Sequence, residues 1–388
     1  MSDSIITFFP VSNGGMTLLR LNDFWNTTIL IDINIRDAVS SEENICDVAQ
    51  ELNDRLKVDS DKRPYVDAFI LTHHHDDHIL GLREYFHLGP VSDYKETKNG
   101  SIPKVIIREL WCTSRFWKQA SENYTLSDDA KAFNKEMKRR VKLFKDAKII
   151  QQDGDRAIII GKDPNGETDG LDMIVREVGT TFSKINERNI SAKVEGIILG
   201  PLEQQNDEPD EDFEDKNRQS IIMQLNVKET SYIHQILMTG DAECLVWEKL
   251  WKLYQTSDHL MYDLLLTPHH CSWHSLSYDS QSDDENPQIC KDAKSALSQK
   301  KAGARIIAQC KPIKDDDDDP PSKAAKDEYL TLVSDDCFYC TDEYPDEKSP
   351  EPIEFNLTSA GPQKKGLKEK SKISIAAIAS TKESYPHG

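Results

Sequence analysis

Short apolar runs separated by polar turns are the dominant pattern along this chain. At the N-terminus, the runs at 4–10 and 16–21 flank an Asn-Gly-Gly turn, and a third run at 26–35 follows directly. Alternating runs joined by a glycine-containing turn are typical of antiparallel strands. We therefore expect a three-stranded meander at the start of the chain. The largely apolar residues 66–72 predict a buried strand that ends at Thr72.

Segments with apolar residues three or four positions apart alternate with further strand-like runs. The helical spacing occurs at 47–56, 129–147, 242–254 and 324–333, and the segment 282–298 contains another helix-like stretch. Strand-like runs occur at 105–113, 147–160, 171–179, 194–202, 220–227, 232–241, 262–272, 304–310 and 353–359. Two strand-rich halves that each end in helices predict an α+β fold, in which two mixed sheets pack face to face with helices on their outer faces.

The expected organisation is a single domain over residues 1–362. An acidic loop at about 203–216 and the aspartate run 315–319 interrupt it. Residues 363–388 are expected to form a charged linker and a C-terminal strand or tail. Either acidic segment could dock a partner protein, although a solvated loop is the more common use of such a composition.

The charge balance narrows the classes of function. The chain has 68 acidic and 48 basic residues and a formal net charge of −20. General coating of nucleic acid needs a cationic surface, so this class is disfavoured. Among eight cysteines only Cys337 and Cys340 form a CxxC pair, which favours reduced thiols in a cytoplasmic protein. No apolar run approaches the ~20 residues of a membrane helix, so no membrane segment is expected.

One expected helix, 129–147, departs from this acidic background. Its polar face is basic and consists of Lys131, Lys135, Lys138, Arg139, Lys142 and Lys145. A solvated helix face is the simpler interpretation. The functional alternative is a guide for an anionic substrate, with Lys135, Lys138 and Lys142 as the candidate contacts.

Side chains that bind metal ions follow three of the expected strands. The segment LTHHHDDHILG, residues 71–81, places four histidines and two aspartates directly after one strand. Two other strands end in Gly240-Asp241 and in His269-His270. Transition metals are bound by neutral imidazoles and carboxylates that converge on a rigid frame. Three such strand ends therefore predict a metal site at one edge of the sheets.

Alternation divides the first of these segments. His73 and His75 are two positions apart in extended chain, so their side chains point the same way. His74 and Asp76 should then point away from the metal ions.

The same segments resemble the motifs of a known family. THHHDDHILG is similar to the THxHxDHxxG signature of the metallo-β-lactamase-fold hydrolases. In chain order, VSNGGM with ILIDIN, NRQSIIMQLNV, LMTGDAE and LLLTPHHCSWHS resemble the soluble hydrolase domain of competence-type DNA-uptake proteins, from about residue 5 to about residue 360. The resemblance implies an αββα sandwich that holds one or two metal ions, usually zinc, at one edge of its sheets.

The resemblance also implies ligand roles. His73 and His75 would bind the first metal ion, Asp77 and His78 the second, and Asp241 would bridge both.

Four further roles follow from the same motifs. His269 would complete the second site, and His270 is the alternative because the two are adjacent. We prefer His269, since it follows the strand directly. Asp32 would brace the ligand loop. Asn217 and Ser272 are candidates for substrate binding.

Two positions depart from the family pattern. Many relatives have a third histidine ligand for the first metal, and here only His87 and His234 lie between the first motif and Asp241. His87 follows the motif too closely, and the odd offset of His234 from Asp241 turns it to the other face of its strand. Cys271 stands where the family usually has glycine, and we expect a buried, inert thiol there.

The predicted function is metal-dependent hydrolysis. Two divalent ions, zinc or alternatively manganese, would bind a water molecule and lower its pKa towards about 7. The water would then be present as a hydroxide at neutral pH. Asp77 and His270 are the candidate catalytic residues, with His270 or His274 as an acid for the leaving group. The competence-type resemblance favours a phosphodiester substrate, hence a nuclease or phosphodiesterase acting on a nucleic acid or nucleotide. The alternatives are a hydrolase of a small ester, thioester or lactone, and a partner-dependent or non-catalytic subunit.

Overall fold

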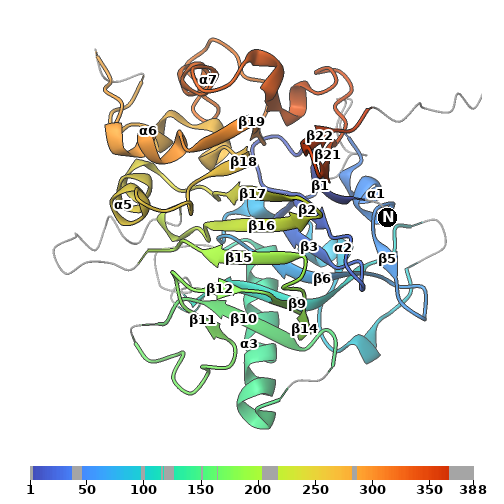
Figure 1. The fold of residues 1–388 in the computed structure, drawn as a ribbon. Coiled ribbons are helices and arrows are strands. Elements are labelled where there is room, and N and C mark those ends of the chain that lie inside the picture. The colour runs from blue at the N-terminus through green and yellow to red at the C-terminus, as the bar shows by residue number, and fades with distance from the viewer. Residues whose placement is uncertain are drawn as a thin grey trace, which may run out of the picture.

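The computed structural model describes residues 3–36, 46–97, 101–114, 117, 126–149, 152–163, 165–202, 217–281 and 286–366. The expected acidic loop at 203–216 and the expected C-terminal segment from residue 367 onward lie outside these residues. The described chain is a mixture of helices and mixed sheets, which confirms the α+β class (Figure 1).

The larger sheet contains the N-terminal strands. In the described residues it has 11 strands in the order β11-β10-β9-β6-β3-β2-β1-β21-β22, with β5 and β8 paired to β6 and β9. Their bounds are β1 Ser4–Phe8, β2 Thr17–Arg20, β3 Thr28–Ile31, β5 Lys57–Val58, β6 Pro64–Ile70, β8 Phe86–His87, β9 Val105–Thr113, β10 Arg156–Ile160, β11 Val175–Arg176, β21 Ile353–Thr358 and β22 Gly361–Lys364. Strands β1, β2 and β3 pair antiparallel, which confirms the predicted meander. Strands β3, β6, β9, β10 and β11 are parallel to one another.

The smaller sheet contains strands from the second half of the chain. Over the part of the chain that the structure describes, it has 7 strands in the order β12-β15-β16-β17-β18-β19-β20. Their bounds are β12 Thr181–Phe182, β15 Val194–Ile198, β16 Met223–Glu229, β17 Tyr232–Met238, β18 Tyr262–Leu266, β19 Lys300–Ala308 and β20 Phe338–Cys340. Two short pairs stand apart from both sheets, β4 Ile33–Asn34 with β7 Ile79–Leu80 and β13 Lys184–Ile185 with β14 Arg188–Asn189.

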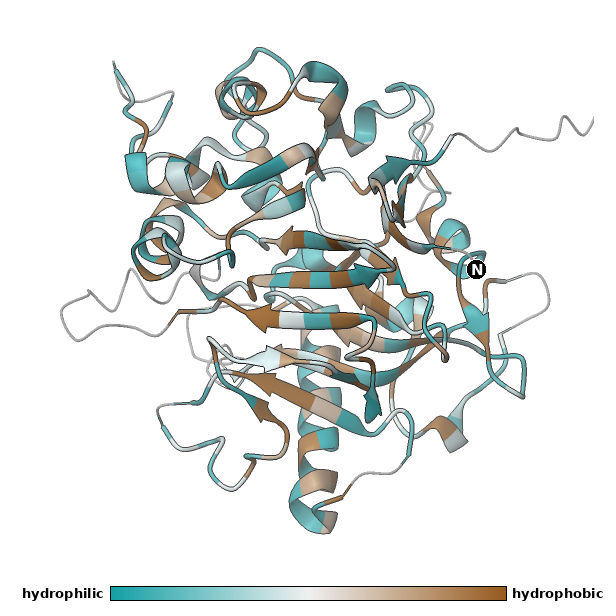
Figure 2. Ribbon diagram, viewed as in Figure 1, coloured by the Kyte–Doolittle hydropathy of each residue, from teal (hydrophilic) through white to brown (hydrophobic). Residues whose placement is uncertain are grey.

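Helices cover the outer faces of the two sheets. Their bounds are α1 Val48–Asn53, α2 Leu82–Tyr85, α3 Asp128–Ala147, α5 Cys244–Tyr254, α6 Lys291–Leu297 and α7 Lys323–Leu330. One apolar cluster joins α3 to the larger sheet and another joins α5, α6 and α7 to the smaller one. A third cluster contains residues from both sheets, such as Phe8 and Met223, and so lies between them. Figure 2 shows the hydrophobic residues concentrated on the strands, as burial on both faces requires.

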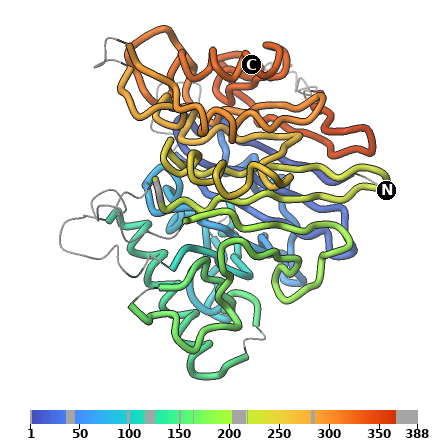
Figure 3. The backbone as a smooth tube through the Cα atoms, turned by 60° about the vertical axis from the view of Figure 1, so that its left-hand side comes forward, coloured from blue at the N-terminus to red at the C-terminus, as the bar shows by residue number. Residues whose placement is uncertain are grey.

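The two ends of the described chain meet in the larger sheet. Strand β21 pairs with β1 over the register Ser4↔Leu357 to Phe8↔Ile353. Figure 3 shows the red β21–β22 hairpin beside the N-terminus. Strand β22 runs across residue 362, where we expected the domain to end. The helix expected within 282–298 is α6, whereas among the described residues the strands expected at 147–160 and 171–179 are only as long as β10 and β11.

The strands that end in ligand-type residues reach one common edge. The main-chain N–H of Asp32, after β3, donates to the carbonyl of Ile70 at the end of β6 over 3.0 Å. The N–H of Ile221, before β16, donates to the carbonyl of Thr72 over 3.0 Å and so ties the two sheets together at this edge. In the described residues, no helix is long and apolar enough to cross a membrane.

Candidate metal centre

Two overlapping groups of imidazole and carboxylate side chains lie at this edge. The first group consists of His73, His75 and Asp241. The second group consists of Asp77, His78, Asp241 and His270. Within each group the potential ligand atoms lie within 4.8 Å of one another. Asp241 belongs to both groups. The fold therefore brings the three predicted strand ends together in space.

The residues directly after β6 alternate in direction, as their spacing predicts. The Nε2 of His73 lies 3.4 Å from the Oδ2 of Asp241 and 3.0 Å from the Nδ1 of His75. His74 points away from the cluster, and its ring centroid lies 5.3 Å from that of Phe133 in α3. Both His73 and His74 are buried, so the alternation sends one imidazole to the cluster and the next into the helix layer.

The chain then turns through the short 3-10 helix η1, Asp76–His78, which supplies the second group. The Nε2 of His78 lies 3.2 Å from the Oδ2 of Asp241, and its Nδ1 lies 2.8 Å from the Oδ2 of Asp32. Asp76 is exposed, whereas Asp77 is half-buried. This contact between Asp32 and His78, the Asp32 brace, fits the bracing role expected for this aspartate.

Asp241 reaches the cluster because Gly240 permits a close backbone turn after β17. Gly240 has φ of +51°, and a Cβ on it would lie 2.6 Å from the Cβ of Ser220. The N–H of Asp241 donates to the Oγ of Ser220 over 2.9 Å. This contact fixes the backbone that carries Asp241, whose carboxylate is almost fully buried.

His270, and not His269, enters the second group, so our preference between the two is revised. The Nε2 of His270 lies 3.2 Å from the Oδ2 of Asp241 and 3.3 Å from the Oδ2 of Asp77. Its Nδ1 lies 3.0 Å from the carbonyl oxygen of Gln309. His269 points outward, with its Nε2 3.4 Å from the Nδ2 of Asn217. The reversal arises because both histidines are left-handed, with φ of 47° and 52°, where simple strand alternation does not hold.

Burial and mutual charge divide the protonation of the cluster. Burial, together with the charge of His78, lowers the pKa of His73 to about 3. Burial also opposes the charged form of His270, but the carboxylate of Asp241 outweighs it and raises the pKa of His270 to about 9. Despite burial, the nearby imidazoles hold the pKa of Asp77 and of Asp241 below the usual range. Buried, ionised carboxylates demand positive charge beside them.

Two features of the site were absent from our sequence-based ligand set. Gly15 lies against the brace, because a Cβ on it would be 2.8 Å from the Nδ1 of His78 and 2.9 Å from the Oδ2 of Asp32. Gln309, after β19, donates from its side chain to the carbonyls of Phe9 and Met16. The SNGG turn was a signal for the first feature, whereas the sequence carried none for Gln309.

A small cavity lies against the cluster. It has a volume of about 20 Å³, and its lining includes Asp241 and His270 as well as the apolar side chains of Ile31, Met238 and Leu266 from both sheets. This volume accommodates about one water molecule.

The candidate substrate contacts lie in different surroundings. Asn217 is at the rim of the cluster, where its Nδ2 donates to the Oε1 of Glu243 over 3.0 Å. Ser272 is fully buried, and its Oγ accepts the N–H of His274, so we revise its expected role to that of a loop cap.

The basic helix face is smaller than its sequence pattern indicates. Lys135, Lys138 and Lys142 are exposed on α3, and Lys142 pairs with Asp146. Arg139 lies between Glu136 and Asp155 and does not belong to the exposed face. The start of α3 lies beside the ligand loop, because Asp129 accepts the N–H of Gly81. The lysines follow along the helix away from that end.

No third histidine joins the first group within the described ranges. His87 contacts the carbonyl of Pro90, and His234 contacts the carbonyl of Thr358. Cys271 is fully buried, and burial raises the pKa of its thiol well above the usual value, as expected for an inert side chain.

The donor set fits divalent metal ions. The Nδ1 atoms of His78 and His270 are held by neighbouring groups while their Nε2 atoms face the shared oxygen of Asp241. This orientation is typical of metal-binding imidazoles. The chain matches no model of a known protein family, and no curated protein matches it either.

Proposed function

We propose that this protein is a metal-dependent hydrolase of the metallo-β-lactamase family, with an αββα sandwich that carries two divalent ions, zinc first and manganese as the alternative. The observation that carries the proposal is the shared Oδ2 of Asp241. It lies 3.4 Å from the Nε2 of His73 and 3.2 Å from the Nε2 atoms of His78 and His270. One carboxylate oxygen between two ligand sets is the arrangement that a two-ion site needs.

The chain would provide the ligands and the orientation of the reaction. Bound divalent ions lower the pKa of water and neutralise charge that develops on a substrate oxygen. His73 and His75 would hold one ion, while Asp77, His78 and His270 would hold the other. Because the Nε2 of His270 faces Asp77 and Asp241, we assign it as a ligand and no longer as the acid for the leaving group. His269, with Asn217 beside it, is the imidazole placed to contact a substrate.

Phosphodiester bonds are the proposed substrate class. The motif resemblance supports it, and the exposed lysines of α3 could contact an anionic chain that extends beyond the cluster. The same cluster could hydrolyse a small ester, thioester or lactone, because this chemistry also needs an activated water and a stabilised oxyanion. The complete set of four donors in the second group favours catalysis over a non-catalytic subunit.

Metal content and a matched pair of variants test the proposal. Purified protein should contain close to two zinc or manganese ions per chain. Asp77→Asn should abolish hydrolysis, whereas Asp76→Asn, which changes the exposed neighbour, should not. Activity would be measured on single-stranded DNA, duplex DNA, RNA and bis-p-nitrophenyl phosphate, beside ester and lactone substrates. Absence of metal from the protein, or full activity of Asp77→Asn, would refute the proposal.

A further inference from the structure

Thr72 lies between the bracing carboxylate and the first imidazole of the cluster. Its Oγ1 lies 2.6 Å from the Oδ2 of Asp32 and 3.0 Å from the Nδ1 of His73. The Oδ2 of Asp32 also lies 2.8 Å from the Nδ1 of His78. All four side chains are almost fully buried, so water does not compete for these contacts.

Hydrogen-bond chemistry fixes the direction of each contact. An ionised carboxylate only accepts, so the hydroxyl of Thr72 and the Nδ1–H of His78 both donate to Asp32. With its proton used, the hydroxyl oxygen of Thr72 is the acceptor for the Nδ1–H of His73. Each ring then carries its proton on Nδ1. The Nε2 atoms of His73 and His78, which would bind the ions, therefore face the Oδ2 of Asp241, at 3.4 Å and 3.2 Å.

We propose that the Thr72 hydroxyl is a positioning group that extends the Asp32 brace from His78 to His73, so that one carboxylate orients an imidazole in each of the two ligand groups. The inference rests on the proposed metal function and goes further, because it couples the two ion sites through a single buried residue. Metal-binding imidazoles depend on such outer contacts for ring orientation and basicity.

Ser220 is the competing partner for the same ring nitrogen. Its Oγ lies 3.4 Å from the Nδ1 of His73, which is longer than the contact with Thr72. The same Oγ already accepts the N–H of Asp241. The shorter contact and the link to a charged acceptor make Thr72 the dominant partner.

The backbone around Thr72 allows its hydroxyl to be tested alone. Its N–H donates to the Oδ1 of Asp32 over 2.7 Å, and its carbonyl accepts the N–H of Ile221. Neither bond involves the side chain, so Thr72→Val removes the hydroxyl while keeping shape and backbone contacts. Thr72→Ser keeps the hydroxyl and serves as the rescue variant.

Cobalt titration of the metal-free protein, followed by visible absorption, reports the two sites as two binding steps. Thr72→Val should weaken one step by about 10–100-fold and leave the other unchanged, whereas Thr72→Ser should keep both. Asp32→Asn should weaken both steps. Equal weakening of both steps by Thr72→Val, or no weakening, would overturn the inference.

A second readout does not depend on metal. In metal-free protein labelled with ¹⁵N-histidine, the His73 ring signals, assigned by their loss in His73→Gln, should report a proton on Nδ1. Thr72→Val should shift them towards the other tautomer, and Thr72→Ser should not. Unchanged signals in Thr72→Val would refute the positioning role. If the wild-type protein binds no metal but Thr72→Val still shifts the His73 signals, the proposed function is refuted and the hydroxyl contact remains supported.

Discussion

Two adjacent imidazoles do different work at the end of β18. His269, His270 and Cys271 are three consecutive non-glycine residues with left-handed φ of 47°, 52° and 67°. Each such residue costs about 1–2 kcal/mol relative to the right-handed region, so the surrounding fold must hold this turn in place. The turn sends His270 to the carboxylates and His269 to the rim, and that separation explains why only one of them is placed to bind metal.

We expect the two alanine variants to separate in metal content. His270→Ala should lose about one ion per chain, because it removes a donor from the complete four-donor group. His269→Ala should keep both ions and lower kcat/KM by about tenfold, as expected for the loss of one substrate contact worth about 1.4 kcal/mol. Metal analysis and steady-state kinetics on bis-p-nitrophenyl phosphate measure both effects. Loss of metal in His269→Ala with retention in His270→Ala would contradict this assignment.

The spacing of residues along the sequence correctly predicted which side chains point to the cluster after β6. It failed after β18 for a physical reason. Residues 73–78 begin in extended chain, so alternation separated His73 from His74 from the sequence alone. At His269 the chain leaves the extended region at once, and no local pattern reveals a left-handed turn without glycine.

The turn between β1 and β2 is the element that closes over the brace. The N–H of Gly15 donates to the carbonyl of Asp77 over 3.1 Å, which holds the turn against η1. A side chain at position 15 would collide with His78 and Asp32 at 2.8–2.9 Å. Glycine is thus required here by space.

Gly15→Ala should therefore damage the second ligand group. Displacement of the contact between Asp32 and His78 should weaken metal binding by about 10–100-fold and destabilise the fold by about 1–3 kcal/mol. Gly366→Ala is the control, because a Cβ there meets nothing within 4 Å. Calorimetric metal titration and urea unfolding measure the two effects. Wild-type metal affinity in Gly15→Ala would show that the turn does not support the brace.

Helix α3 allows the proposed substrate class to be tested at the level of an element. Charge reversal of Lys135, Lys138 and Lys142 should lower kcat/KM for a polynucleotide by about tenfold or more at low salt, since each lost cationic contact weakens counterion release. The small substrate bis-p-nitrophenyl phosphate should be unaffected, and salt should reduce the difference. Lys184, Lys300 and Lys364 lie outside α3, and their reversal is the matched control. Equal effects on both substrates would remove α3 from the substrate path.

Apolar runs located most strands but not their extent or their partners. Strands β6, β9 and β18 follow from predominantly apolar segments. Strand β20 is only three residues long, and β22 carries little apolar character of its own, because an edge position does not require burial on both faces. The pairing of β1 with β21 joins the two ends of the described chain, and local pattern has no information on such a contact.

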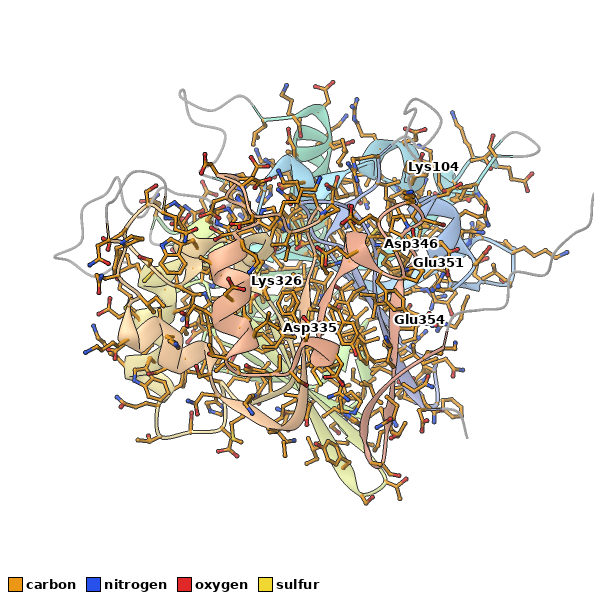
Figure 4. All side chains as sticks on the ribbon, turned by 90° about the horizontal axis from the view of Figure 1, so that it is seen from above. Lys104, Lys326, Asp335, Asp346, Glu351 and Glu354 are labelled. Atoms are coloured by element: carbon orange, nitrogen blue, oxygen red, sulfur yellow. The ribbon has the colours of Figure 1, made fainter. Side chains whose placement is uncertain are left out.

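A cluster of ion pairs around Glu354, the Glu354 cluster, lies near the junction of β1 and β21. Glu354, on β21 and labelled in Figure 4, accepts hydrogen bonds from Arg20 at the end of β2 and from Arg55 just after α1. Lys365, beyond β22, contacts the same carboxylate over 3.0 Å. The Glu354 cluster therefore ties the last two strands to the N-terminal meander.

The pH dependence of the free energy of unfolding should show how much the Glu354 cluster contributes to stability. Burial opposes ionisation of Glu354, but hydrogen bonds and charge from Arg55 outweigh it and lower its pKa from 4.5 to about 2. A pKa lowered by folding stabilises the protein above the unfolded value, and this contribution is lost as the pH falls from 4.5 towards 2.

Glu354→Gln should accordingly reduce the free energy of unfolding by about 1–2 kcal/mol at pH 7, a figure reduced from the full linkage value because the carboxyl retains some solvent screening. The difference between variant and wild type should shrink as the pH falls below about 4.5 and should nearly vanish near pH 2. Denaturant unfolding at a series of pH values measures it, in metal-free protein so that loss of ligands does not contribute. A constant difference from pH 7 down to pH 2.5 would mean that Glu354 stabilises the junction by packing, and that its charge contributes nothing.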